Sequence, residues 1–211
     1  MFRLIEDSGE VGELLLYFLQ EAVLEAPQIL CKMELKTNRK DEVKGADGIH
    51  INWNINKNCL NLFIGESKLY QGYGSAIKST LKSIDELHSN GKLDQEIKLV
   101  TSHFKHLDEN LKNAVSTYLD DTNPEGSINL IHSCLIGYDW PEYKKLLGPN
   151  RAEFIAHFEE TYRCDAEKLQ NKLEELFSDF KHKHYSYEFF FIPFAAVQEF
   201  RDEFYRVLTG N

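Results

Sequence analysis

Two neighbouring segments of the chain alternate apolar and polar residues in the manner of β-strands. In residues 48–55, GIHINWNI, every second residue is apolar: Ile49, Ile51, Trp53 and Ile55. Residues 60–70, LNLFIGESKLY, begin with the same alternation, at Leu60, Leu62 and Ile64. Alternate side chains of a strand point to opposite faces of a sheet. The polar segment NKNC between the two segments indicates a turn, so the pattern predicts an antiparallel hairpin.

Apolar residues spaced three and four apart predict helices elsewhere in the chain. We predict helices over residues 9–26, where Pro27 stops the helix, and over residues 73–88, 107–119, 151–183 and 197–208. Further strands are predicted over residues 128–138, as an inner strand, and 185–194, whose FFFIPF run is expected to be buried. Residues 94–100 fit either a strand or a helix, and residues 32–44 fit a loop or an edge strand.

This order of elements predicts a mixed α/β fold, with a central sheet flanked by helices. The 211 residues, 42% of them hydrophobic, suffice for one domain with a substantial core. We therefore predict a single domain over residues 1–211, with its core at about 9–138 and a helical and strand completion at about 151–208.

The composition bears on location and partners. The N-terminal sequence MFRLIEDSGE is acidic and lacks the basic region of a signal peptide, and no apolar run approaches the length of a membrane span. The four cysteines form no CxxC pair, so we expect reduced thiols in a cytoplasmic protein, with no membrane association. The histidines lack the companion ligands of a zinc site, and none is expected.

The net charge of −10 argues against a protein that coats nucleic acid through a broad basic surface. It leaves open a nuclease, because a metal-binding active site is itself acidic. In such a protein, the contacts to substrate must be local or be supplied by a partner.

Charged residues interrupt the apolar face of the hairpin at one end. If Lys57 and Asn58 form a two-residue loop, Asp47 lies opposite Lys68, and Glu66 lies diagonally from Asp47 on the same face. Diagonal side chains are roughly 7–8 Å apart at their Cα atoms. Two carboxylates at that separation can bridge a divalent cation, whose oxygen ligands lie about 2.0–2.6 Å away.

These residue types suit phosphodiester hydrolysis. A cation held by Asp47 and Glu66 would activate a water molecule and neutralise charge on the phosphate, and Lys68 could orient or deprotonate the water or contact the phosphate. Glu-x-Lys alone is a common tripeptide, and a solvated ion pair at the sheet edge is the competing interpretation. The functional interpretation is favoured by the combination of an Asp, about twenty residues, and then Glu-x-Lys on adjacent strands, followed by a glycine break and a helix.

The segments KGADGIHINW, FIGESKLY and GSAIKSTLKSID, with the leading GEVGELLLYFL helix, resemble the HamA family of the Hachiman anti-phage defence system. The Asp…Glu-x-Lys arrangement is that of the PD-(D/E)XK nuclease superfamily, although Ala46 stands where a proline is usual. The resemblance implies a restriction-endonuclease-like fold and Mg²⁺- or Mn²⁺-dependent cleavage of DNA beside a superfamily-2 helicase subunit similar to HamB. On the superfamily motif, Asp47, Glu66 and Lys68 are the catalytic residues, and Asp47 and Glu66 the metal ligands.

Other residues are weaker candidates. Many superfamily members contribute a Glu from the first helix, which points to Glu13 or, less well, Glu10. An acidic first turn that complements the helix dipole is an equally good explanation. Lys78 and Lys82 could contact a phosphate, although a solvated helix face accounts for them. Two alternative functions remain: a catalytically silent subunit that regulates the helicase, and a ribonuclease on the same fold.

Overall fold

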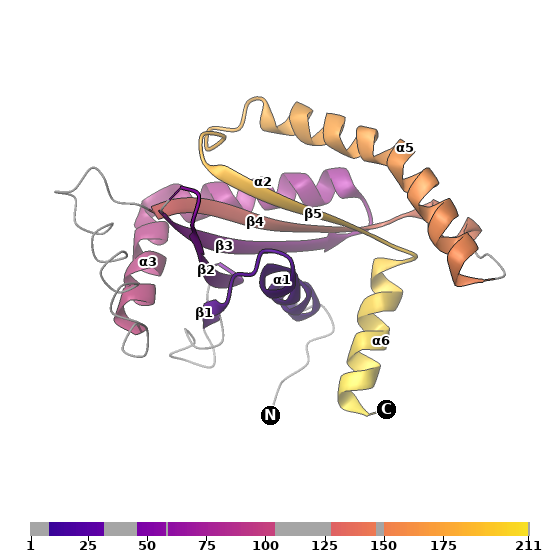
Figure 1. Ribbon diagram of the computed structural model, residues 1–211, viewed down its shortest axis with the longest axis horizontal. Helices are drawn as coiled ribbons and strands as arrows, with labels where there is room; N and C mark the ends of the chain where they lie inside the picture. The colour runs from indigo at the N-terminus through magenta and orange to yellow at the C-terminus, as the bar shows by residue number, and fades with distance from the viewer. Residues whose placement is uncertain (1–8, 32–45, 58, 104–127, 147–149, 211) are drawn as a thin grey trace.

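The computed structural model describes residues 9–31, 46–57, 59–103, 128–146 and 150–210 (Figure 1). Its elements, in chain order, are α1 (Glu10–Ala22), β1 (Gln28–Cys31), β2 (Gly48–Asn54), β3 (Cys59–Tyr70), α2 (Tyr73–His88), the short helix η1 (Ser89–Gly91), α3 (Lys92–His103), β4 (Ile128–Asp139), the short helix η3 (Pro141–Lys145), α5 (Arg151–Phe177), β5 (Ser186–Phe194) and α6 (Val197–Thr209). The helix predicted at 107–119 and the segment 32–44 lie outside the described residues.

The strands form one five-stranded sheet in the order β1-β2-β3-β4-β5. The pairs β1–β2 and β2–β3 are antiparallel, and β3–β4 and β4–β5 are parallel. A parallel pair requires a crossover connection, and α5 lies in the crossover from β4 to β5. The mixed α/β fold, consistent with the restriction-endonuclease-like type, is confirmed.

Helices cover both faces of the sheet. On one face, α2 and α5 pack against β4 and β5 through residues such as Ile77, Leu173 and Ile136. On the other face, α1 and α6 pack against β3–β5 through residues such as Leu16, Leu69 and Tyr205. Figure 1 shows α5 on one side of the sheet and α1 and α6 on the opposite side. Within the described residues, no helix combines the length and apolarity that a membrane crossing requires.

The first helix is shorter than predicted, and it is followed by a strand that the pattern did not indicate. Helix α1 ends at Ala22, and Glu25 then adopts a left-handed conformation (φ 51°) that turns the chain back toward the sheet. Residues Gln28–Cys31 pair with β2 as an edge strand. The edge strand therefore begins directly after Pro27, ahead of the residues for which the sequence suggested one.

Three other predictions needed adjustment. Residues 94–100 lie in helix α3, which resolves the choice between strand and helix. The helix predicted over residues 151–183 ends at Phe177, because the chain turns at residues 178–184 to begin β5. The FFFIPF run is not fully buried: β5 is the outermost strand, and its aromatic side chains are half-buried. An edge position also accommodates Pro193, which has no N–H to donate.

The hairpin is confirmed, but its register differs from the prediction. Trp53 pairs with Leu60 rather than with Leu62, and Ile49 pairs with Ile64 rather than with Glu66. The turn is longer than two residues because the Asn54 side chain accepts a hydrogen bond from the Lys57 N–H (3.0 Å) and becomes part of it. A shift of two residues preserves the face of every side chain, so the apolar face remains buried at Ile49 and Ile51, whereas Trp53 is half exposed.

Candidate functional site

The corrected register brings Asp47 opposite Glu66. The Asp47 N–H donates to the Gly65 carbonyl (3.0 Å), directly beyond the last regular pair of β2 and β3. One further step along the ladder sets Asp47 against Glu66, with Lys68 as the diagonal neighbour. The predicted order is therefore exchanged: the two carboxylates are opposed, and the lysine is diagonal to Asp47.

Asp47 is held in place by the residue between Glu66 and Lys68. Its Oδ2 accepts hydrogen bonds from both the Ser67 N–H (2.8 Å) and the Ser67 hydroxyl (2.7 Å). The Ser67 N–H lies at the edge of β3 where β2 has ended, so the Asp47 carboxylate takes the place of a strand carbonyl. Hydrogen bonds from two donors fix the carboxylate orientation without neutralising its charge.

Glu66 is nearly buried, with its side chain 13% exposed. Burial and, to a lesser extent, the negative charge of Asp47 raise the pKa of its carboxyl group to about 7. The Lys68 ammonium and a hydrogen bond from Ser83 of α2 act in the opposite direction. A carboxyl whose pKa lies near neutral pH beside a second carboxylate is a site where added positive charge is favourable.

Lys68 forms an ion pair with Glu66 and is itself largely buried. Burial tends to lower the pKa of its ammonium group, but the charges of Glu66 and Asp47 outweigh that tendency, so the pKa of Lys68 is raised. Lys68 therefore stays protonated at neutral pH. In that state it can donate hydrogen bonds to a phosphate or a water, and it cannot accept a proton.

The candidate metal ligands are two carboxylates, those of Asp47 and Glu66. Across the part of the chain that the structure describes, no three histidine, cysteine, aspartate or glutamate side chains are grouped to hold a metal ion. Asp47 and Glu66 supply oxygen ligands of the kind that Mg²⁺ prefers, and Mg²⁺ commonly takes only one or two carboxylates with water and substrate phosphate as further ligands. The repulsion that raises the pKa of Glu66 is the energetic reason to expect a cation between the two.

Glu13 lies in the first turn of α1, half-buried. The adjacent Gly12 lies against Ser67, and a Cβ atom at Gly12 would approach the Ser67 hydroxyl to 2.9 Å, so only glycine permits this close approach of α1 to β3. The helix thus brings Glu13 to the same end of the sheet as the three predicted residues. Its role as a ligand stays a prediction. Lys82 pairs with Glu86 (3.7 Å) on the exposed face of α2, as a solvated helix face would.

Two contributors were not identified from the sequence. Ser67 was passed over because it points to the face opposite Glu66, yet its backbone and hydroxyl hold Asp47. The strand end at Gly48 could have indicated that the Ser67 N–H needs a side-chain acceptor. Ser83 reaches Glu66 from the middle of α2, a contact for which the local sequence carries no signal.

The group of Asp47, Glu66 and Lys68, which we call the carboxylate site, thus combines two opposed acids with one protonated lysine at the end of a sheet. Such a set can bind a divalent cation and, through it, a phosphate. A solvated surface ion pair does not describe it, because Lys68 and Glu66 are only 24% and 13% exposed.

Comparisons with known proteins point to one family. The model of the HamA family matches residues 3–208, nearly the whole chain. No curated protein matches the sequence. The matched region includes every residue of the carboxylate site.

Proposed function

This chain belongs to the HamA family of the Hachiman anti-phage defence system, and from that premise we propose that it is a Mg²⁺-dependent nuclease that cleaves DNA. The observation that carries the proposal is the opposition of Asp47 and Glu66, in which burial and mutual repulsion raise the pKa of Glu66 to about 7. An acidic pair of this kind, left without a cation, costs stability, and proteins retain such pairs chiefly where function requires them.

Each residue has a distinct role in the proposed reaction. Asp47 and Glu66 would bind Mg²⁺, or Mn²⁺ in its place, which when bound lowers the pKa of a water molecule and offsets charge on the scissile phosphate. Ser67 orients Asp47. Lys68 is protonated, so it stabilises negative charge on the phosphate oxygens and positions the attacking water by hydrogen bonds, rather than removing the water's proton.

The acidic character of the chain supports a partner in substrate binding. Each phosphate contact needs a local Lys or Arg, and the chain has 24 basic residues against 34 acidic ones. We therefore propose that a superfamily-2 helicase subunit similar to HamB supplies most of the grip on DNA and keeps the nuclease from intact DNA. A cytoplasmic location is part of this proposal, supported by free thiols at Cys59, Cys134 and Cys164 among the described residues.

Incubating the purified chain with plasmid, linear DNA and RNA tests the proposal, in Mg²⁺ or EDTA and with or without the helicase. We expect Mg²⁺-dependent loss of DNA that the helicase modulates, together with co-purification of the two proteins. Cleavage of RNA alone would support the ribonuclease alternative. Absence of cleavage under all conditions, with retained helicase binding, would support the silent regulatory subunit.

A further inference from the structure

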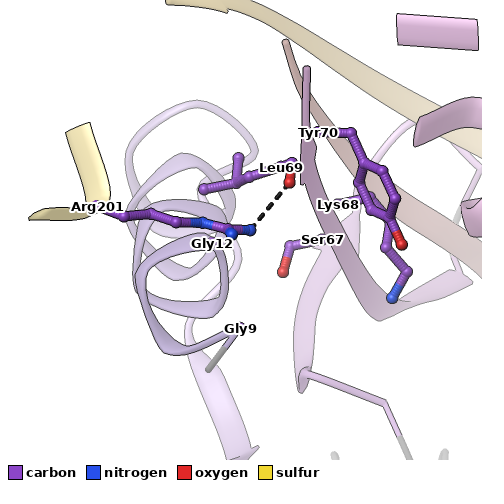
Figure 2. Close-up of a pocket in the computed structure, with 7 residues that line it drawn as sticks. All are labelled: Gly9, Gly12, Ser67, Lys68, Leu69, Tyr70 and Arg201. Carbon is purple, nitrogen blue, oxygen red and sulfur yellow. Dashed lines mark hydrogen bonds between the residues drawn. The ribbon is translucent and has the colours of Figure 1, made fainter. Parts of the chain in front are cut away.

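A small pocket lies beside the carboxylate site, on the side of α1 and α6. It has a volume of about 190 Å³ and is lined by Gly9, Gly12, Ser67, Lys68, Leu69, Tyr70 and Arg201. Figure 2 shows Arg201 extending from α6 toward β3, with the Ser67 hydroxyl between Arg201 and Lys68 in this view. Pockets for drug-sized ligands typically measure ~300–1,000 Å³, so this one suits a small chemical group rather than a whole nucleotide.

The pocket exists because β3 extends beyond the end of its neighbour β2. Strand β2 begins at Gly48, whereas β3 continues to Tyr70. Among the described residues, two side chains bind the edge atoms that a longer β2 would have paired. Asp47 accepts from the Ser67 N–H (2.8 Å), and the Arg201 Nη2 donates to the Leu69 carbonyl (2.9 Å).

Arg201 retains binding capacity in this position. Its Nε is buried and has no hydrogen-bond partner, and within the described residues its guanidinium forms no ion pair. By contrast, Arg206 on the same helix is paired with Glu203 through two hydrogen bonds (2.8 and 2.6 Å). A buried donor without an acceptor costs free energy, and a bound anion in the pocket would remove that cost.

The rest of the lining leaves room for a small anion beside the Arg201 guanidinium, because Gly9 and Gly12 carry no side chain. Lys68 and Tyr70 direct their polar ends to the α2 side of β3, toward Glu66 and Ser79, and do not compete for this space. Guanidinium groups bind phosphate through paired N–H donors. We propose that this pocket binds a phosphate of the DNA strand next to the scissile one, with Arg201 as the phosphate-binding residue. The proposal rests on the nuclease function proposed above, and it assigns to α6 a part in holding the substrate.

Binding of a fluorescein-labelled duplex oligonucleotide in EDTA, followed by fluorescence anisotropy over a series of salt concentrations, tests this contact without cleavage. For Arg201→Gln we expect an affinity about 10-fold lower than wild type, and a slope of log K against log salt that is smaller by about 1. Arg206→Gln is the matched control and should behave as wild type, because Arg206 is already paired with Glu203.

Gly9→Asp provides a second test that does not disturb the Leu69 contact. Gly9 precedes α1 with an ordinary φ of −71°, and an added Cβ atom would meet only the Glu13 carboxylate, at 3.6 Å, so the fold should be retained. A carboxylate at the rim of the pocket should repel the phosphate and weaken binding several-fold. Gly9→Asn, which has the size of Asp without its charge, should weaken binding less than Gly9→Asp.

Unchanged affinity and slope in both Arg201→Gln and Gly9→Asp would overturn the inference, as would an equal loss in Arg206→Gln. Displacement of the oligonucleotide by inorganic phosphate as readily as by an unlabelled strand would also overturn it, because the pocket would then bind the free ion. Cleavage of the same oligonucleotide in Mg²⁺ is measured separately. Normal cleavage with an unchanged salt slope refutes only the Arg201 contact. The expected slope change without any cleavage by wild type refutes the nuclease function instead.

Discussion

Helix α2 contributes side chains to two clusters of buried polar residues on the sheet. The two clusters differ in how the cost of burying charge is offset. At the carboxylate site, Ser83 donates to Glu66, and like charges remain opposed. Farther along the same helix, His88 meets His132 of β4, with their Nε2 atoms 2.9 Å apart, and stacks on His182 at a ring separation of 4.3 Å. We call His88, His132 and His182 the histidine cluster.

The histidine cluster is balanced by loss of charge. Burial lowers the pKa of His132 to about 3 and that of His88 to about 4, with the neighbouring histidines adding to both shifts. Both rings are therefore neutral at pH 7, and one Nε2 can donate to the other. At the carboxylate site this solution is incomplete at pH 7, because a carboxyl group with a pKa of about 7 is then about half ionised, and Lys68 offsets only one of the two acids. Buried polarity that is satisfied within the protein indicates a structural role, and buried charge that is not indicates a ligand.

The largest expected effect is on DNA cleavage, which should depend on the carboxylate site and not on the histidine cluster. Replacing Glu66 and Lys68 together with Ala should reduce DNA cleavage at least about 100-fold and abolish phage protection. The fold should persist, because removing both partners leaves neither charge buried alone. Thermal melting and a plasmid assay measure the two properties. Replacing Lys82 and Glu86, an exposed pair on the same helix, should change neither. Full protection by the Glu66/Lys68 variant would mean that the carboxylate site is not catalytic.

The histidine cluster should control stability in acid. The pKa values of His88 and His132 are lower in the folded state than the ordinary value of 6.5, so the unfolded state binds more protons below about pH 6.5. The contribution of the two histidines to the free energy of unfolding should thus be largest above that pH and fall as the pH drops toward 3. The raised pKa of Glu66 acts in the opposite direction between about pH 7 and 4.5, equally in wild type and in a histidine variant. Each pKa unit corresponds to about 1.4 kcal/mol, and we expect a loss on the order of 2 kcal/mol between pH 7 and 5.

Urea denaturation of wild type and His132→Phe at several pH values measures this effect. The variant should show a shallower dependence on pH while retaining Mg²⁺-dependent cleavage. Parallel pH profiles for the two proteins would refute the role of His132.

Bound metal should stabilise the protein through the carboxylate site and not through the histidine cluster. At pH 8, Mg²⁺ at 100 times its dissociation constant should stabilise the wild type by about 2.7 kcal/mol, measured as a rise in melting temperature. Asp47→Asn should show little of this rise. Because the pKa of Glu66 is raised to about 7, the folded carboxyl is protonated below that pH and competes with the cation, so the effect should shrink at pH 6. An equal rise in Asp47→Asn would place the bound metal elsewhere.

The smallest expected effect concerns the orientation of the Asp47 carboxylate. Ser67→Ala removes the hydroxyl bond to Asp47 but retains the backbone bond. A single hydrogen bond contributes about 1 kcal/mol, so we expect a loss of about 5-fold in the cleavage rate. Ser75→Ala, at an exposed position on α2, is the control. A loss as large as that of the Glu66/Lys68 variant would show that Ser67 does more than orient Asp47.

The sequence predicted what depends on local pattern. Alternation identified β2 and β3, and it assigned Glu66 and Lys68 to one face, because face depends only on residue parity. The predicted register was wrong by two residues because the Asn54 side chain, rather than the apolar pattern, determines the length of the turn. This error left the face of Asp47 unchanged and altered only its partner.

The features that escaped prediction arise from tertiary contacts. Strand β1 is only four residues long and has no alternation of its own to distinguish it from a loop. Arg201 reaches Leu69 across 132 positions of sequence. The stacking of His182 on His88 likewise joins distant segments, which no local spacing encodes.

The most direct test compares plasmid cleavage by wild type, Glu66→Gln and His132→Phe, side by side in Mg²⁺ and in EDTA, at a temperature where all three are folded. We expect wild type and His132→Phe to cut DNA in Mg²⁺ and not in EDTA, and Glu66→Gln to cut in neither. Cleavage by Glu66→Gln at the wild-type rate, or cleavage by wild type in EDTA, would contradict the claim that opposed carboxylates make this protein a metal-dependent nuclease.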